Sequence, residues 1–368
     1  MKFEIGKESF SAAIGMITSV LDKKATVPLF GMVNIVSYLP EGNSDNGKIV
    51  LYGMNGVSEI RTEIEATVSE AGQVAVSGEV LGGIVRKLPL KPVKVELSSS
   101  IMNVKCGRSK FKVTTLNDLA PSLVDSDYTE VSFKAGASVF VPAIKMVAFA
   151  MSDDASRHYL NGVHIDFGGE ETNIVATDGH RLARKVVEVD SFLGDATKSY
   201  TIPRPAVEFL SKYANGDVEV SFTSRKIKVE FLGGTFISNL IDGVYPDYRR
   251  VIPPTEGCRA EIDTSEFART ISLVTATSEA KTRAVKLNFS EGLLVTTAGS
   301  DGNEGKDEIE IEFEGAPTIT GLNGKYLAEI LSSVEAPGIV LWFAKDKPVK
   351  LIPSDDPNFT AICMPLRV

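Results

Sequence analysis

The chain has 368 residues, of which 43% are hydrophobic and 24% are charged, a composition typical of a soluble globular protein with two or three domains. Apolar runs stay well short of the roughly 20 residues that a membrane-spanning helix needs, and the amino end lacks the apolar core of a signal peptide. The net charge of −9 counts against tight nucleic-acid binding by the surface as a whole, although a locally basic face could still bind phosphates.

The three cysteines, Cys106, Cys258 and Cys363, are far apart and form no C-x-x-C pair. A sparse and odd set of cysteines argues against a disulfide framework and against a structural zinc site. We therefore expect neither a metal nor a cofactor, and a cytoplasmic protein in a reducing environment.

The first third of the chain predicts a strand, an amphipathic helix and then a hairpin. Phe10, Ile14, Ile17 and Val20 are three or four residues apart, which places them on one face of a helix. Asn55-Gly56 follows an apolar run and precedes a charged, alternating run, as expected for a tight β-turn whose central residues tolerate φ > 0. The predicted elements are a strand at 2–5, a helix at 9–21, strands at 49–54 and 73–76, a helix at 81–88 and a strand at 93–97.

The same series of elements recurs twice more. Asp178-Gly179 and Asp301-Gly302 take the place of the first dipeptide, and consecutive dipeptides are about 123 residues apart. Each third also ends in a hairpin whose last strand carries a phenylalanine, at Phe111, Phe236 or Phe359. The second set of elements is 131–134, 141–151, 174–177, 199–202, 206–213 and 218–222, and the third is 259–262, 265–275, 293–298, 317–320, 326–332 and 339–343.

A unit repeated at constant spacing indicates three tandem domains. We predict an α+β fold in which each domain packs two helices on antiparallel sheets, with domains at 1–125, 126–253 and 254–368. The segments 118–130 and 246–257 are predicted to be linkers, because the first is rich in Asp, Ser and Pro and the second contains two consecutive prolines.

Two of the predicted helices begin beside residues that can cap them. Ser9 and Ser265 are candidate caps, and Asp263 is a nearby competitor for the later helix. The oxygen that accepts a hydrogen bond from a backbone N–H of the first turn identifies the cap.

The three histidines, His158, His164 and His180, raise the question of acid–base chemistry. Asp178 and His180 are the candidate pair, but Asp178 occupies the repeated turn position, which already explains its residue type. A catalytic site also needs a nucleophile or a metal partner, and none accompanies this pair. The chain is therefore predicted to be non-enzymatic, with catalysis by Asp178 and His180 as an alternative.

Four segments carry a resemblance to one family. They are 157–162 (R-H-Y-L-N-G), 176–183 (A-T-D-G-H-R-L-A), 244–253 (V-Y-P-D-Y-R-R-V-I-P) and 362–368 (I-C-M-P-L-R-V). Their combination resembles the bacterial sliding clamp, the beta subunit of the replicative DNA polymerase III holoenzyme, and the resemblance covers the whole chain. A carboxyl end that is written as a strand also indicates a docked terminus rather than a frayed one.

The resemblance implies the DNA-clamp fold and a ring-shaped homodimer that closes head to tail around duplex DNA. Binding would be topological and independent of sequence, because helices that face phosphates contact DNA without reading bases. The implied function is a processivity factor without catalytic activity. Its implied partners are the DNA polymerase catalytic subunit, the clamp loader, and repair and translesion polymerases that dock through short hydrophobic peptide motifs. Positions that resemble the family's DNA contacts are Lys24, Arg157, His158 and Tyr159.

The family also carries a pocket for those peptide motifs between the second and third domains, an apolar slot with a few polar anchors. Thr282 stands where some relatives have an aromatic residue at the rim, and Ala276 and Thr277 are smaller than expected at the dimer contact. Carried over by motif, the pocket residues are Leu160, Thr177, Gly179, His180, Arg181, Leu182, Pro246, Arg250, Val251, Pro348, Ile362, Met364, Pro365, Leu366 and Arg367.

An alternative of another class is a threefold-repeat scaffold that binds proteins without encircling DNA. The repeat itself fits both hypotheses. Retention on circular DNA and loss on linear DNA would separate them.

Overall fold

The computed structural model describes residues 1–22, 24, 26–40, 46–123, 129–167, 171–279 and 283–367. The chain forms two compact units. The first contains residues 1–138, 190–195 and 208–240, and the second contains residues 139–189, 196–207 and 241–368. Within the described ranges, no helix combines the length and the apolar character that crossing a membrane requires.

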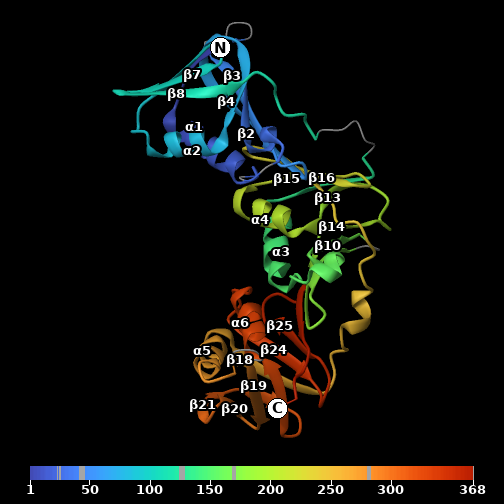
Figure 1. The fold of residues 1–368 in the computed structure, drawn as a ribbon. Helices are drawn as coiled ribbons and strands as arrows, with labels where there is room; N and C mark the ends of the chain where they lie inside the picture. The colour runs from blue at the N-terminus through green and yellow to red at the C-terminus, as the bar shows by residue number, and fades with distance from the viewer. Residues whose placement is uncertain are drawn as a thin grey trace. The chain divides into compact units, whose positions relative to one another are not determined.

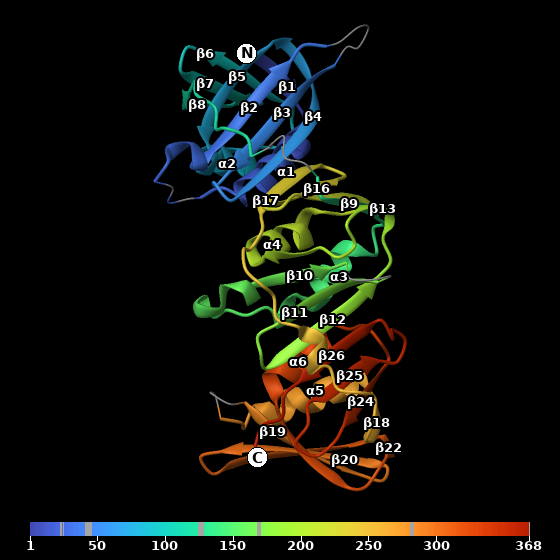
Figure 2. The ribbon, with the colours of Figure 1, turned by 90° about the vertical axis from the view of Figure 1, so that its right-hand side faces the viewer.

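The first unit is built on thirteen antiparallel strands in the order β1-β6-β7-β8-β5-β2-β3-β4-β17-β16-β15-β9-β13. Helices α1 (Lys7–Thr18) and α2 (Gly78–Lys87) lie side by side against these strands, as Figures 1 and 2 show. The short helix η1 (Pro28–Gly31) precedes β2. The strands are β1 Lys2–Ile5, β2 Met32–Tyr38, β3 Gly47–Met54, β4 Ser58–Glu70, β5 Gly72–Ser77, β6 Val93–Ser98, β7 Ile101–Cys106, β8 Ser109–Leu116, β9 Val131–Ala135, β13 Asp190–Gly194, β15 Val218–Phe222, β16 Lys226–Phe231 and β17 Gly234–Asn239.

The second unit contains a nine-stranded sheet, β14-β10-β11-β12-β26-β25-β24-β18-β22, and a four-stranded sheet, β21-β20-β19-β23. Its strands are β10 Gly162–Asp166, β11 Thr172–Thr177, β12 Arg181–Val187, β14 Ser199–Pro203, β18 Cys258–Asp263, β19 Ala284–Ser290, β20 Leu293–Ser300, β21 Asn303–Glu310, β22 Glu312–Glu314, β23 Thr318–Asn323, β24 Gly338–Phe343, β25 Val349–Pro353 and β26 Phe359–Cys363. Its helices are α3 Phe140–Val147, α5 Thr264–Thr275 and α6 Gly324–Ser332, with short 3₁₀ helices η2 Ala148–Ala150, η3 Ala155–Leu160 and η4 Tyr248–Val251. Helix α4 (Arg204–Tyr213) begins in this unit and ends in the first.

Apolar helix faces form the cores that the spacing predicts. Phe10, Ile14 and Ile17 of α1 are buried, and so are Phe267 and Ile271 of α5. Helix α5 packs against α6 as α1 packs against α2. Each core therefore closes between a helix pair and antiparallel strands, which confirms the α+β prediction.

The sheets continue from one sequence repeat into the next. In the first unit, β4 pairs with β17, and the hydroxyls of Ser58 and Ser238 lie 3.0 Å apart across the pair. In the second unit, β12 pairs with β26, and Leu182 faces Ile362. Since edge-to-edge pairing satisfies backbone groups that would otherwise be exposed, each repeat stabilises its neighbour.

The predicted helix caps need correction. Ser9 lies within α1, whose cap is Gly6, without a side-chain hydrogen bond. At α5, the Asp263 carboxylate accepts the backbone N–H of Glu266 at 2.8 Å and the hydroxyl of Ser265 at 2.6 Å. Asp263 is therefore the cap, because a carboxylate one turn ahead reaches the free N–H groups that Ser265, already inside the helix, cannot.

Two of the three repeated turns also differ from the prediction that both central residues have φ > 0. The glycines do, with φ of 86° at Gly56, 88° at Gly179 and 83° at Gly302, but of the preceding residues only Asp301 does, at 53°. Asn55 and Asp178 instead accept two backbone N–H groups of the following turn through their side chains. A side-chain acceptor thus replaces the tight two-residue turn with a three-residue loop in the first two repeats.

Candidate functional site

The loop between β11 and β12 is held rigidly by its own side chains. Asp178 Oδ1 accepts the backbone N–H groups of His180 at 2.8 Å and Arg181 at 2.9 Å. The Thr177 hydroxyl donates to the Arg181 carbonyl at 2.6 Å and accepts the Gly179 N–H at 3.1 Å. His180 is left exposed at the surface. A loop fixed in this way presents its outward groups at little entropic cost.

The carboxyl-terminal segment runs along this loop. Ile362 on β26 lies opposite Leu182 on β12, and the Met364 N–H donates to the His180 carbonyl at 2.9 Å. Farther on, the Leu366 N–H donates to the Gly321 carbonyl on β23 at 2.8 Å. The prediction of a docked terminus is therefore confirmed for residues up to Leu366. Met364, 41% exposed, offers an apolar surface beside His180.

Arg181 lies behind this surface rather than on it. Its side chain is only 8% exposed, and its guanidinium pairs with Asp178 at 3.1 Å and with Glu329 on α6. It also lies over the rings of Tyr326, 4.3 Å from the centroid, and Phe149, at 5.3 Å. Paired and stacked on several sides, Arg181 joins the loop to α6 and positions the surface.

The segment that joins the second and third repeats is anchored by two tyrosines. The Tyr248 hydroxyl donates to Asp166 Oδ2 at 3.0 Å, and its ring packs with Leu182 and Ile362. The Tyr245 ring stacks on His164, with centroids 4.1 Å apart and planes 3° from parallel. These contacts hold in place the segment that carries the predicted pocket residues Pro246, Arg250 and Val251.

His164 is a buried member of this anchor. Its Nδ1 lies 3.0 Å from the Thr201 hydroxyl, and burial lowers the pKa of its imidazole to about 4, with Asp166 opposing and Arg249 adding to the shift. Burial likewise raises the pKa of the Tyr245 and Tyr248 phenols. The anchor is therefore a neutral stack beside one ion pair, Arg249 with Asp166 at 2.7 Å.

The structure sorts the predicted pocket residues into a buried base and an exposed surface. Pro348 is half-buried just before β25, and Pro365 is half-buried in the terminal segment. The buried members are Leu160, Thr177, Arg181, Leu182 and Ile362. The exposed members are Gly179, His180, Pro246, Arg250, Val251, Met364, Leu366 and Arg367.

Some of these positions are joined by contacts and others only by the chain. The loop and the terminal segment meet through hydrogen bonds, and Pro246 and Val251 flank the anchored Tyr248. Arg250, 84% exposed, pairs with Asp247 at 2.8 Å. Leu160 ends η3 in a buried position, which also fits the alternative of core packing. Thr282 lies outside the described residues.

Sequence reasoning missed the residues that support the surface from behind. Phe149, Tyr326 and Glu329 surround Arg181, and Tyr245 and Asp166 fix the joining segment. Tyr326 and Glu329 share a face of α6, since they are three residues apart. That spacing alone does not indicate that both side chains contact the guanidinium of Arg181.

The predicted DNA-contacting residues lie on two surface segments. Lys24 is exposed after α1, and its backbone N–H donates to Asp22 at 2.8 Å. Arg157, His158 and Tyr159 lie together on η3, where Arg157 pairs with Asp154 at 2.9 Å. Six basic residues of the helices are exposed: Arg86, Lys87, Lys145, Lys212, Arg269 and Lys325.

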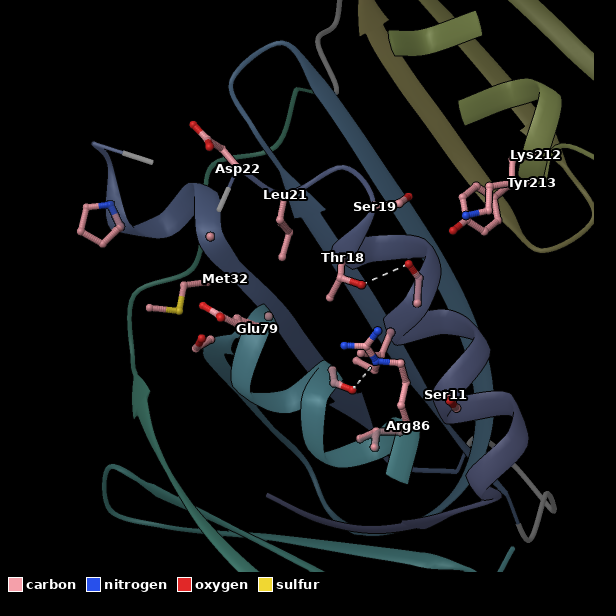
Figure 3. Close-up of a pocket in the computed structure, with 18 residues that line it drawn as sticks. Ser11, Thr18, Ser19, Leu21, Asp22, Met32, Glu79, Arg86, Lys212 and Tyr213 are labelled. Atoms are coloured by element: carbon pink, nitrogen blue, oxygen red, sulfur yellow. Dashed lines mark hydrogen bonds between the residues drawn. The ribbon is translucent and has the colours of Figure 1, made fainter. Parts of the chain in front are cut away.

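A cavity of about 770 Å³ lies between α1 and α2, as Figure 3 shows. Gly15 and Gly82 line it, and a Cβ at Gly82 would lie 3.4 Å from the Thr18 methyl group of α1. Arg86 points between the two helices, with Nε donating to the Gly82 carbonyl at 3.1 Å. Asp22, Glu79, Arg86 and Lys212 give its wall both signs of charge. Such a wall does not indicate one class of ligand. Among the described residues, no cluster of His, Cys, Asp and Glu could hold a metal.

Repeated α+β units whose antiparallel sheets continue from one repeat into the next define the sliding-clamp class of protein. The chain belongs to the DNA polymerase III beta subunit family. The family's N-terminal domain matches residues 1–119, its central domain residues 136–247 and its C-terminal domain residues 249–367. It is accordingly a non-catalytic sliding clamp of DNA replication.

Named relatives and solved structures agree along the full length. The beta sliding clamps of Caulobacter vibrioides and Escherichia coli K12 are 28% and 27% identical, each with 100% of both chains covered. The Pseudomonas aeruginosa sliding clamp bound to griselimycin superimposes with a TM-score of 0.92 at 25% identity, again over 100% of both chains. The Caulobacter crescentus beta sliding clamp, with PEG bound to its putative beta-motif tethering region, gives a TM-score of 0.88 at 28% identity and the same coverage.

Proposed function

We propose that two copies of this chain close head to tail into a ring around duplex DNA and tether the replicative polymerase for processive synthesis. The observation that carries the proposal is the full-length family match together with sheets that run on between repeats. Like units joined in series close into a ring when the rotation per unit divides a full turn. The rival, a scaffold that binds proteins without encircling DNA, rests only on the repeat.

Two strand edges with complementary charge support the head-to-tail contact. Within the described residues, Ser109–Thr114 of β8 pair only with β7, and β21 pairs only with β20. The β8 edge carries Lys110 and Lys112. Strand β21 carries Glu304, Asp307, Glu308 and Glu310, and its one lysine, Lys306, pairs with Glu308, so this edge stays acidic on balance. Since an unpaired edge is a template for another strand, β8 of one copy and β21 of the other are a suitable pair.

The lining of the ring accounts for DNA contact without sequence readout. Lys24, Arg157, His158 and Tyr159, with the exposed basic residues of the helices, would meet phosphates. A net charge of −9 keeps the non-specific affinity low, so a closed ring can slide. Retention then comes from topology rather than from tight binding.

A peptide pocket on the second unit would receive the partners. The exposed His180, Met364, Pro246 and Val251 would form its surface, three of them apolar, with the buried Leu182 and Ile362 as its base. Such a surface fits short hydrophobic motifs of the polymerase, the clamp loader, and repair and translesion polymerases. We further propose domain boundaries at 1–125, 126–253 and 254–368, and a cytoplasmic location.

The ring is tested by loading the protein onto nicked circular DNA with its clamp loader. Because the link is topological, protein on circles should survive gel filtration and should be lost within minutes when a restriction enzyme linearises the circle. Equal retention on circular and linear DNA would contradict encirclement and favour the scaffold.

The pocket is tested with a His180→Ala variant. Loss of the exposed ring should weaken binding of a fluorescent pentapeptide of the hydrophobic motif class by about fivefold, roughly 1 kcal/mol. His158→Ala, another exposed histidine, is the matched control and should bind the peptide normally. Unchanged affinity in His180→Ala would place the peptide elsewhere.

A further inference from the structure

One strand position recurs in all three repeats with the same register. Asn34 lies opposite Ala75, which lies opposite Leu116. His164 lies opposite Thr201, whose carbonyl accepts the Ile241 N–H at 2.9 Å. In the third repeat Lys286 lies opposite Gly321, which forms a bridge with Leu366. Asn34, His164 and Lys286 are therefore structurally equivalent.

In the first repeat, this position is covered by the segment that follows β8. The Ala120 N–H donates to Asn34 Oδ1 at 2.9 Å, and the Ala120 carbonyl accepts the Tyr52 hydroxyl at 3.1 Å. Leu119 and Leu123 pack on the same surface. Asn34 is consequently 0% exposed.

In the second repeat, the segment after β17 does the same. Tyr245 stacks on His164, and Tyr248 packs on Val175, the strand partner of His164. His164 is 6% exposed. The two covering segments share a pattern, Leu119-Ala120-Pro121-Ser122-Leu123 and Val244-Tyr245-Pro246-Asp247-Tyr248, in which apolar residues flank a proline.

In the third repeat, none of the residues that the structure describes forms a comparable covering segment over the equivalent surface. Lys286 is exposed, and it lines a cleft of about 960 Å³ together with its strand partner Thr297. Leu366 and Arg367 form one end of the cleft, so the cleft continues directly from the docked terminal segment. Within the described ranges, Lys286 makes no ion pair.

We propose that this cleft binds an extended segment of a partner protein, in which apolar residues flank a proline and one carboxylate pairs with Lys286. The first two repeats show which backbone conformation the surface accepts, and their covering segments show the pattern of side chains. Glu279, Asp301 and Glu304 in the lining disfavour a uniformly acidic segment, so a single carboxylate facing Lys286 fits. The cleft shares Leu366 and Arg367 with the predicted pocket residues and Glu304 with the β21 edge, whereas Lys286 and Thr297 belong to neither.

A pair of labelled peptides tests the charge at the central position. Both have the sequence of residues 117–123 with Asp118→Asn and an amidated carboxyl end, one with Ala120→Glu and the other with Ala120→Lys. Each is titrated with the intact protein by fluorescence anisotropy. The Glu peptide should bind saturably and about threefold or more tighter than the Lys peptide. Lys286→Glu should reverse that order, and Thr297→Trp, which fills the cleft, should abolish binding of both peptides.

The controls separate this cleft from the predicted pocket. Lys345→Glu, an exposed charge reversal in a turn of the same unit, should leave both affinities unchanged. His180→Ala should also leave them unchanged. No saturable binding at about 1 mM, or an affinity that Lys286→Glu leaves unchanged, would overturn the proposal. Loss of binding in His180→Ala alone would assign the peptides to the pocket and overturn it equally.

Discussion

At the scale of single residues, burial changes what a polar side chain can do at equivalent positions. Asn34 holds its covering segment by a hydrogen bond, whereas His164 does so by stacking under Tyr245. Burial removes the water that would stabilise a charged imidazole, so His164 stays neutral near pH 7. The stacking of Tyr245 on His164 is therefore most stable at a pH at which the imidazole is uncharged.

The titration of His164 gives a pH-dependent stability. Its pKa falls from 6.5 to about 4 on folding, so the native state binds fewer protons, and stability is lost as the pH falls from 6.5 towards 4. The loss should reach about 3 kcal/mol at most. Urea unfolding of the second unit across this range measures the loss.

His164→Asn, which copies the first repeat, is the matched control. Asparagine does not titrate, so this variant should lack that part of the acid sensitivity. Equal pH slopes in the variant and the parent protein would show that His164 does not set the effect.

Residue types in the motif segments located the loop at 177–182, but they did not assign every role. In the structure, His180 is exposed and Thr177 is buried in this loop. Arg181 instead points away to Phe149, Tyr326 and Glu329. Its partner on α6 is far along the chain, and local sequence carries no signal of that contact.

At the scale of elements, free strand edges determine how copies can associate. Phe111, 37% exposed, and Leu116, 39% exposed, add apolar surface to β8, and Leu273, 54% exposed, adds it to α5 beside β21. The small residues Ala276 and Thr277 follow α5 directly. Edge charge and nearby apolar groups together favour pairing with a second copy.

Charge reversal on each edge tests this pairing. One variant, Lys110→Glu with Lys112→Glu, makes both edges acidic, and the other, Glu304→Lys with Glu308→Lys, makes both basic. Each variant alone should dimerise about three- to tenfold more weakly, because like charges meet. Sedimentation velocity measures the dimer fraction.

Mixing the two variants should restore dimers. A head-to-tail pair of one variant with the other has one interface with both charges reversed and one with the original charges. Failure of the mixture to recover, or full dimerisation of either variant alone, would contradict pairing between β8 and β21.

At the scale of the whole molecule, shared sheets connect the repeats within each unit. The second sequence repeat is divided between the two compact units. Its strand β17 pairs with β4 of the first repeat, and its strand β12 pairs with β26 of the third repeat. Sequence periodicity reports how often a motif recurs. It does not report where the densest contacts lie.

The sequence by itself determined the repeat, the α+β class and the buried faces of the helices, because those depend on local periods of about two and 3.6 residues. It also placed glycine in the three turns, because positive φ is a local requirement. Only the tertiary structure decided that Arg181 is sequestered, that Tyr245 covers His164 and that Lys286 is exposed. Those facts depend on which strand edges and segments meet across long stretches of chain, and local propensity does not encode such pairings.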